Sequence, residues 1–179
     1  MREAQCTDAA GIARVHVESW RTTYRGTVPS AYLDVLSAEQ RRPSWERQLC
    51  SAEGRTSVFI AVDATTDEIA GFASGGPEQS GTIAEYPWEL YAIYLLAGRQ
   101  RRGAGRLLVT ALVQRLRERG ARELLLWVLA ENQPARRFYE ALGGTVVRER
   151  SITIGGADLA EIAYGWTDLE ALQRHAADR

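Results

Sequence analysis

A loop with two glycines joins a buried strand to a helix in the middle of the chain. Residues 100–106 read Gln-Arg-Arg-Gly-Ala-Gly-Arg and follow an apolar run over 90–97. Unpaired N–H groups at a helix N-terminus bind anions with help from the helix dipole, and glycines let a phosphate approach the main chain. Guanidinium groups suited to bidentate phosphate contacts surround the turn, on Arg99, Arg101, Arg102 and Arg106. The loop predicts a phosphate-binding site.

Two other nucleotide-binding motifs do not match this loop. The dinucleotide fingerprint fails because Leu108 stands where its third glycine would fall. The Walker A motif fails because the chain has no lysine, which also excludes Schiff-base chemistry. A purely structural alternative stays open, in which the glycines shape a tight turn and the arginines form a solvated face.

A second polar segment follows the next strand. Asn132 precedes a helical face that carries Ala135 and Tyr139. Asn132 is alternatively a simple helix cap, and Tyr139 an ordinary core aromatic. Both segments emerge at the carboxyl ends of neighbouring parallel strands, where open α/β sheets usually bind ligands.

The hydrophobic pattern predicts the elements that position these segments. Strands are expected over 2–6, 57–62, 69–74, 90–95, 123–129, 145–154 and 159–166. Helices are expected after Thr7 or Asp8, over 30–36, 38–49 (with Pro43 in its first turns or as a break), 104–119 and 134–142, and after the capping pattern that begins at Thr167. Residues 75–87 read as a surface loop, and helix 104–119 as a right-handed crossover between parallel strands.

The composition limits the class of protein. The chain has 179 residues, 45% of them hydrophobic, and a net charge of −1, which predicts one domain over 1–179 and no nucleic-acid partner. No apolar run is long enough to cross a membrane and the N-terminus lacks a secretory signal, so we expect a cytoplasmic protein. Two cysteines, Cys6 and Cys50, and two histidines are too scattered for metal-ligand spacing, so we expect no metal and no required disulfide.

The two polar segments together resemble the GCN5-related N-acetyltransferase (GNAT) superfamily. Residues 100–105, QRRGAG, are similar to that family's acetyl-coenzyme A signature QxxGxG, and residues 131–144, ENQPARRFYEALGG, to its second conserved segment. The helical segment 20–26, WRTTYRG, is typical of bacterial members, whereas Ala97 replaces a common proline. The resemblance implies an α/β (α+β) GNAT fold: a mixed, mostly antiparallel sheet of about six or seven strands, a splayed central parallel pair, and helices on both faces.

The resemblance implies acetyl-coenzyme A as the cofactor and suggests its contacts. Loop amides would hold the pyrophosphate, the main chain of residues 93–95 would pair with the pantetheine arm as a pseudo-strand, and Arg136 or Arg137 would reach the 3′-phosphate or else be a surface charge. The expected cofactor-binding residues are Ile93, Tyr94, Leu95, Gln100, Arg101, Arg102, Gly103, Ala104, Gly105, Arg106, Asn132, Ala135, Arg136 and Tyr139.

Amide formation from a thioester needs a base, an oxyanion donor and an acid, and the resemblance suggests a residue for each. Glu89 matches a catalytic glutamate of many members and would deprotonate the amine directly or through water, with Glu85 in reserve; alternatively, Glu89 is a solvated strand-end carboxylate. The main-chain N–H of Ile93 is the expected oxyanion donor. Tyr139 matches the family's general acid.

The expected activity is acetyl transfer to a primary amine on a small molecule, an antibiotic-like compound or a peptide. Neither cysteine lies in a motif, so direct attack in a ternary complex is expected. A non-catalytic acyl-coenzyme A-binding module is the alternative, and a homodimer is an option because small members often pair through their C-terminal strands. Aromatic and acidic groups that suit a cationic amine, or that simply fill the core, are Trp20, Tyr24, Tyr32, Glu85, Trp88 and Tyr91.

Overall fold

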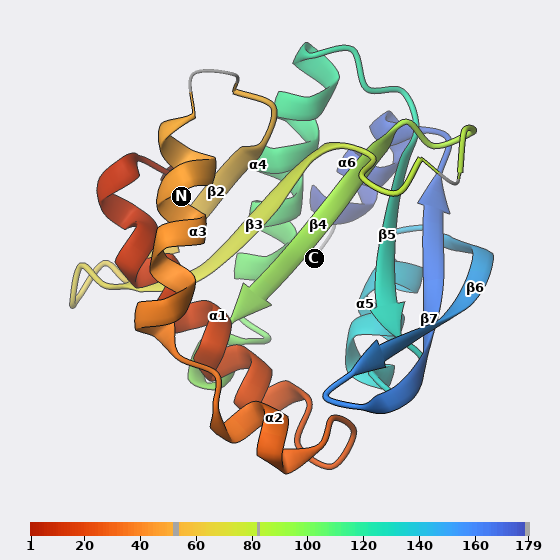
Figure 1. Ribbon diagram of the computed structural model, residues 1–179. Coiled ribbons are helices and arrows are strands. Elements are labelled where there is room, and N and C mark those ends of the chain that lie inside the picture. The colour runs from red at the N-terminus through yellow and green to blue at the C-terminus, as the bar shows by residue number, and fades with distance from the viewer. Residues whose placement is uncertain (52–53, 82, 178–179) are drawn as a thin grey trace.

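A seven-stranded sheet in the order β1-β2-β3-β4-β5-β7-β6 forms the centre of the computed structural model, which describes residues 1–51, 54–81 and 83–177 (Figure 1). Neighbouring strands are antiparallel except β4 and β5, which run parallel. The strands are β1 (Arg2–Glu3), β2 (Ser57–Val62), β3 (Ile69–Pro77), β4 (Trp88–Leu95), β5 (Leu124–Leu129), β6 (Thr145–Ile154) and β7 (Ala157–Trp166). The expected mixed, mostly antiparallel sheet is confirmed.

Helices cover both faces of this sheet (Figure 1). The helices are α1 (Ala9–Thr23), α2 (Ser30–Asp34), α3 (Ala38–Cys50), α4 (Ala104–Glu118), α5 (Gln133–Ala141) and α6 (Leu169–Ala177). On one face, Ile12 of α1 and Trp45 of α3 pack against Phe72 of β3. On the other, α4 buries Leu108 and Leu112 in a larger core. Among the residues described, no helix is long and apolar enough to cross a membrane.

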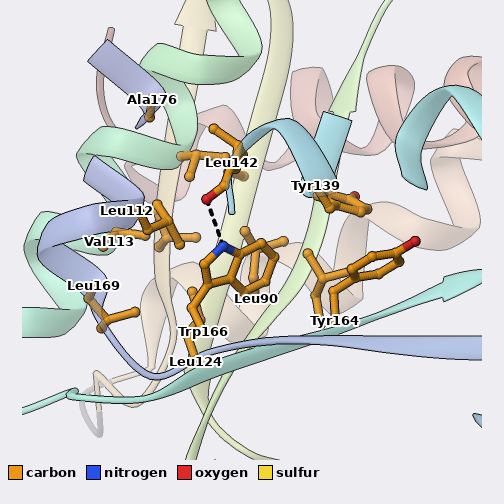
Figure 2. Close-up of a cluster of buried hydrophobic side chains, with 14 of the residues drawn as sticks. Leu90, Leu112, Val113, Leu124, Tyr139, Leu142, Tyr164, Trp166, Leu169 and Ala176 are labelled. Carbon is orange, nitrogen blue, oxygen red and sulfur yellow. Dashed lines mark hydrogen bonds between the residues drawn. The ribbon is translucent and has the colours of Figure 1, made fainter. Parts of the chain in front are cut away.

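Trp166, the last residue of β7, fixes the end of α5 in that larger core (Figure 2). Its indole Nε1–H donates to the carbonyl of Leu142 at 2.9 Å. Gly144 allows the close approach, because a Cβ there would lie 2.6 Å from the indole ring. The contact sets how α5, and with it Tyr139, lies over the sheet.

Several predicted boundaries differ from the structure by up to three residues, and two of these differences have a clear local cause. The first strand ends at Glu3, because residues 6–8 form a 3₁₀ turn in which the Asp8 carboxylate accepts the N–H of Gln5 at 2.7 Å. Strand β3 runs three residues into the predicted 75–87 loop. Gly75 fits there because a Cβ would lie only 2.7 Å from the carbonyl oxygen of Glu89. The connecting loop is therefore 78–87, of which residue 82 lies outside the described part.

The structure also shows which residues cap α6 and α3, and how α3 accommodates a proline. At the start of α6 the capping group is Asp168 rather than Thr167, since its Oδ1 accepts the N–H groups of Glu170 and Ala171, each at 2.9 Å. Pro43 lies inside α3 without breaking it, and Ser37 caps that helix through the N–H of Gln40.

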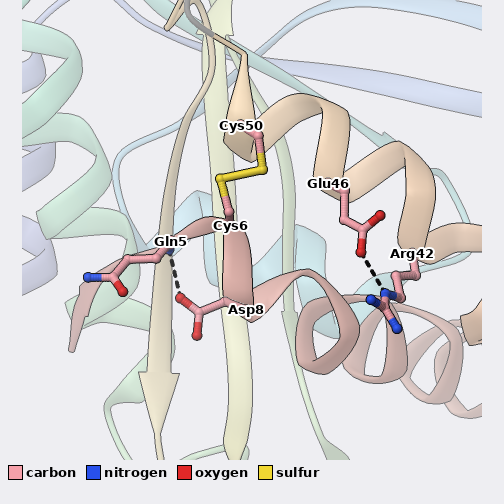
Figure 3. The surroundings of a disulfide bond; sticks show 6 residues. All are labelled: Gln5, Cys6, Asp8, Arg42, Glu46 and Cys50. Atoms are coloured by element: carbon pink, nitrogen blue, oxygen red, sulfur yellow. Dashed lines mark hydrogen bonds and ion pairs between the residues drawn. A yellow bond between two sulfur atoms is a disulfide. The ribbon is translucent and has the colours of Figure 1, made fainter.

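Cys6 and Cys50 are joined in a disulfide, contrary to the expectation that none is required (Figure 3). The bridge links the turn before α1 to the last residue of α3, with the two Cα atoms 5.3 Å apart. Spacing along the chain does not reveal this pair, because 44 residues separate the cysteines and only the packing of α3 brings them together.

Candidate active site

The parallel strands β4 and β5 separate after one residue pair. Strand β4 pairs with β3 over its whole length, and β5 pairs with β7 over its whole length. Between β4 and β5 the only pair is Glu89 with Leu125, near the start of both strands. Figure 1 shows the two strands diverging toward their arrowheads. The expected splayed pair is confirmed.

Main-chain groups of β4 face this gap. The N–H of Leu96 donates to the carbonyl of Ala70 at 2.9 Å, which fixes the phase of the β3–β4 ladder. In an antiparallel ladder bonding alternates, so the main-chain groups of Ile93 and Leu95 point away from β3 and into the gap. The main-chain groups of Tyr94 point to Phe72 of β3 instead. Tyr94 therefore does not have the main-chain groups free for the expected pairing, although the residue lines the cavity.

Strand β5 presents the same pattern from the opposite side. The N–H of Ala130 donates to the carbonyl of Ala160 at 2.8 Å, so the alternation turns the main-chain groups of Trp127 and Leu129 toward the gap. An extended arm with amide groups would satisfy both strand edges, because each offers a donor and acceptor every second residue.

A β-bulge at Tyr91 accompanies the separation. Ser74 pairs with Ala92 but its neighbour Gly75 pairs with Leu90, so Tyr91 has no partner on β3. A bulge bends its strand and increases its twist. The Tyr91 hydroxyl donates to the carbonyl of Pro77 at 2.5 Å, which holds the bulged residue in place.

The loop after β4 leaves main-chain N–H groups without acceptors among the described residues. Arg101 and Gly103 have positive φ angles of 58° and 83°. Such alternation turns successive N–H groups to one side and forms an anion-binding nest. No side chain caps Gly103 at the start of α4, and the first-turn amides of residues 104–106 have no acceptor among the described residues. The main chain therefore leaves several donors for a phosphate.

The side chains around this loop divide into two groups. Arg99 forms an ion pair with Asp63, and the guanidinium of Arg106 donates to the carbonyl of His175. These two contacts tie the loop to neighbouring segments of the chain. Gln100 donates from its amide to the carbonyl of Leu95 at 3.0 Å, which ties the loop to the end of β4. The guanidinium groups of Arg101 and Arg102 are exposed.

Helix α5 forms the wall opposite the loop. Asn132 caps it, since its side chain accepts the N–H of Ala135 at 3.3 Å. Arg136 points inward and donates to the Tyr164 hydroxyl and to the carbonyl of Ala130, both at 3.1 Å, so its guanidinium is engaged by these two partners. Its neighbour Arg137 lines the cavity instead.

Loop, strands and α5 enclose a cavity of about 720 Å³. Of the expected cofactor-binding residues, only Arg102, Ala104 and Arg136 are not on its wall. Those on the wall are Ile93, Tyr94, Leu95, Gln100, Arg101, Gly103, Gly105, Arg106, Asn132, Ala135 and Tyr139.

Two buried tyrosines, Tyr24 and Tyr139, and the half-buried Tyr94 border the cavity. The hydroxyls of Tyr24, at the end of α1, and Tyr94 lie 3.2 Å apart. Burial raises the pKa of Tyr24 and of Tyr94. Burial, followed by the nearby Tyr24, also raises the pKa of Tyr139 above its usual range. All three are therefore protonated at neutral pH, and each is a proton donor rather than a phenolate.

Glu89 lies at the closed end of the gap, one residue before the cavity wall begins at Leu90. Its Oε2 accepts the N–H of Gln79 at 3.2 Å. Burial raises the pKa of Glu89, and the hydrogen bond from Gln79 opposes the rise. A carboxyl whose pKa moves toward neutral pH becomes a stronger base when ionised.

Only two of the six residues expected to bind the acceptor amine line the cavity. Tyr24 and Tyr91 line the cavity. The side chain of Trp20 packs on Tyr24, Tyr32 covers Gly155 of the β6–β7 turn, Trp88 lies under the guanidinium of Arg119, and Glu85 is exposed in the 78–87 loop.

Sequence reasoning missed Trp127, which also lines the cavity. Its indole Nε1–H is buried and has no acceptor among the described residues. The period-two alternation of β5 was the available signal, because it places residues 125, 127 and 129 on one face.

The match to a family model decides the relationship. The model of the acetyltransferase (GNAT) family matches residues 15–144. The chain belongs to the GNAT family. The uncharacterized N-acetyltransferase YuaI of Bacillus subtilis (strain 168) is 42% identical over 176 residues, covering 97% of this chain and 95% of that protein. Membership in this family makes the chain an acetyltransferase of the GNAT type, as expected.

Solved GNAT structures have the same fold. The PaiA N-acetyltransferase of Thermoplasma acidophilum, in complex with coenzyme A, superposes with a TM-score of 0.70 at 21% identity, covering 89% of this chain and 95% of that one. YncA of Salmonella typhimurium, with acetyl-coenzyme A, gives 0.68 at 20% identity, covering 93% and 91%. The gap-facing main chain and the anion-binding loop described above fit such a cofactor.

Proposed function

We propose that this enzyme transfers the acetyl group directly to a primary amine, with acetyl-coenzyme A and the amine bound together. The gap between β4 and β5 carries the proposal, because it leaves main-chain donors and acceptors unpaired on both strand edges. Neither sulfur atom is available as an acyl carrier, since Cys6 and Cys50 are bonded to each other away from the cavity.

The residues present fit acetyl-coenzyme A. The amides of 101–106 would hold the pyrophosphate, and Ile93, Leu95 and Trp127 would pair with the arm in the gap. When bound, the thioester supplies the activated acetyl group. The Ile93 N–H then stabilises the negative charge that develops on the acyl oxygen, a preorganised contact of a kind worth about 10²-fold or more in rate.

Proton transfers fall to two side chains on either side of the gap. Glu89 accepts a proton from the incoming ammonium, directly or through water, because at neutral pH most of an alkyl amine is protonated. Tyr139 donates a proton to the departing thiolate, for which its protonated state at neutral pH is suited. Tyr24, Tyr91 and Trp127 form the aromatic wall on the acceptor side.

A thiol-release assay with acetyl-coenzyme A over a panel of amines, including diamines, amino sugars and peptides, tests the proposal. With the best acceptor, Glu89→Gln and Tyr139→Phe each lower kcat by about 10²-fold or more, whereas the matched control Glu85→Gln, in the exposed loop, does not. If coenzyme A binds but no amine accelerates thiol release, the non-catalytic binding module is correct instead.

A further inference from the structure

Glu89 shares one face of the sheet with an aromatic ring and an ion pair. Glu89 pairs with Leu125, and period-two alternation places Trp127 and Leu129 on the same face of β5. Leu129 pairs with Glu161 of β7, which pairs with Arg150 of β6. Four neighbouring strands thus bring Glu89, Trp127, Glu161 and Arg150 to one side of the sheet.

Two contacts fix the guanidinium of Arg150 on this face. Its Nε and one terminal nitrogen lie 2.8 and 2.7 Å from Oε2 of Glu161. Its Cζ lies 3.8 Å from the ring centroid of Trp127, in cation–π geometry. The Glu161 side chain is only 13% exposed. The Arg150 side chain, itself 38% exposed, is therefore held against a residue of the cavity wall at the edge of the solvent.

The other charges that face Glu89 oppose its ionisation. Glu78 comes from the 78–87 loop and Glu161 from β7, and both are negative. Besides the Gln79 N–H, Arg150 is the group that favours the carboxylate. Burial raises the pKa of Glu89, the two glutamates raise it further, and Arg150 lowers it.

We propose that Arg150 is a positioning residue that keeps the Glu89 carboxyl ionised and able to accept the proton of the acceptor amine. Glu161 and Trp127 hold the guanidinium where it acts. This rests on the proposed role of Glu89 as the base. Arg150 contacts Trp127 of the cavity wall and acts on the reaction only through Glu89.

A ¹³C NMR titration of the Glu89 side-chain carboxyl tests the proposal without an acceptor, with Glu89→Gln assigning the resonance. Arg150→Met keeps an apolar stem over Trp127 but removes the charge, so the midpoint should move to higher pH. Glu161→Gln removes a negative charge while the Trp127 ring still holds the guanidinium on this face, so the midpoint should move to lower pH. At the wild-type midpoint we expect the ratio of ionised to protonated Glu89 to fall roughly threefold in the first variant and to rise in the second.

The opposite signs separate charge from structure, because both variants break the same ion pair. Arg150→Lys should restore a midpoint near that of the wild type, and 1 M NaCl should shrink all differences. Equal midpoints, or shifts in the same direction for both variants, overturn the proposal. Full amine-dependent turnover in Glu89→Gln instead overturns the base assignment, whatever the titration gives.

Discussion

The two edges of β4 have opposite characters. On the β3 edge every residue pair is made except at the Tyr91 bulge, whereas on the β5 edge a single pair closes the strand. An unpaired main-chain group inside a protein is costly, so a central strand rarely leaves one edge open without a ligand. The contrast supports the proposal that the open edge receives the cofactor, while the paired edge fixes the strand in the sheet.

Proline substitutions at neighbouring positions of β4 give the largest expected contrast. Ile93→Pro removes an N–H that faces the gap, so we expect a folded protein with kcat lowered about 10²-fold. Tyr94→Pro removes an N–H that pairs with Phe72, so we expect a loss of about 3 kcal/mol or more of folding free energy. Circular dichroism melts and thiol-release rates measure the two effects. Equal destabilisation by both prolines would show that the edges do not differ.

A comparison of two glycine positions tests whether the loop at residues 100–106 binds phosphate. Gly103 and Gly26 both have a φ of 83°, and a Cβ at either would meet nothing within 4 Å. Valine at either position imposes a similar backbone strain, of order 1–3 kcal/mol. Only Gly103→Val displaces the phosphate-binding amides, so we expect KM for acetyl-coenzyme A to rise about tenfold or more in that variant alone. An equal rise in Gly26→Val would contradict this.

His16 of α1 packs against β4 away from the open edge, and we expect its ionisation to change the folding stability rather than the activity. It stacks on the ring of Tyr94 at 5.3 Å, and its Nδ1 is buried without a partner among the described residues. Burial, with a smaller effect of Arg41, lowers the pKa of His16 to about 4. The unfolded chain takes up this proton below about pH 6.5 and the folded one only near pH 4.

The folded state therefore loses stability as the pH falls through that window, by roughly 3 kcal/mol in all. His16→Phe should flatten this part of the dependence of Tm on pH and leave turnover unchanged. The exposed His175→Gln is the control and should keep the wild-type slope. An unchanged slope in His16→Phe would place the acid sensitivity elsewhere.

The sequence could not determine which of Arg136 and Arg137 faces the cavity. Both are arginines at the start of the same helix, and the sequence offered either as a phosphate ligand. In the structure Arg136 turns inward to the Tyr164 hydroxyl, whereas Arg137 lines the cavity. Helical spacing places a side chain on a face but does not say which distant strand meets it.

The order of elements, the parallel crossover and the anion-binding loop were determined by the sequence alone, because they depend on period, capping and glycine over stretches of about ten residues. The residue pair after which β4 and β5 separate, the disulfide between Cys6 and Cys50, and the charges around Glu89 were decided only by the tertiary structure. These features join segments far apart in the chain, so their geometry depends on how whole elements pack and twist rather than on any local pattern.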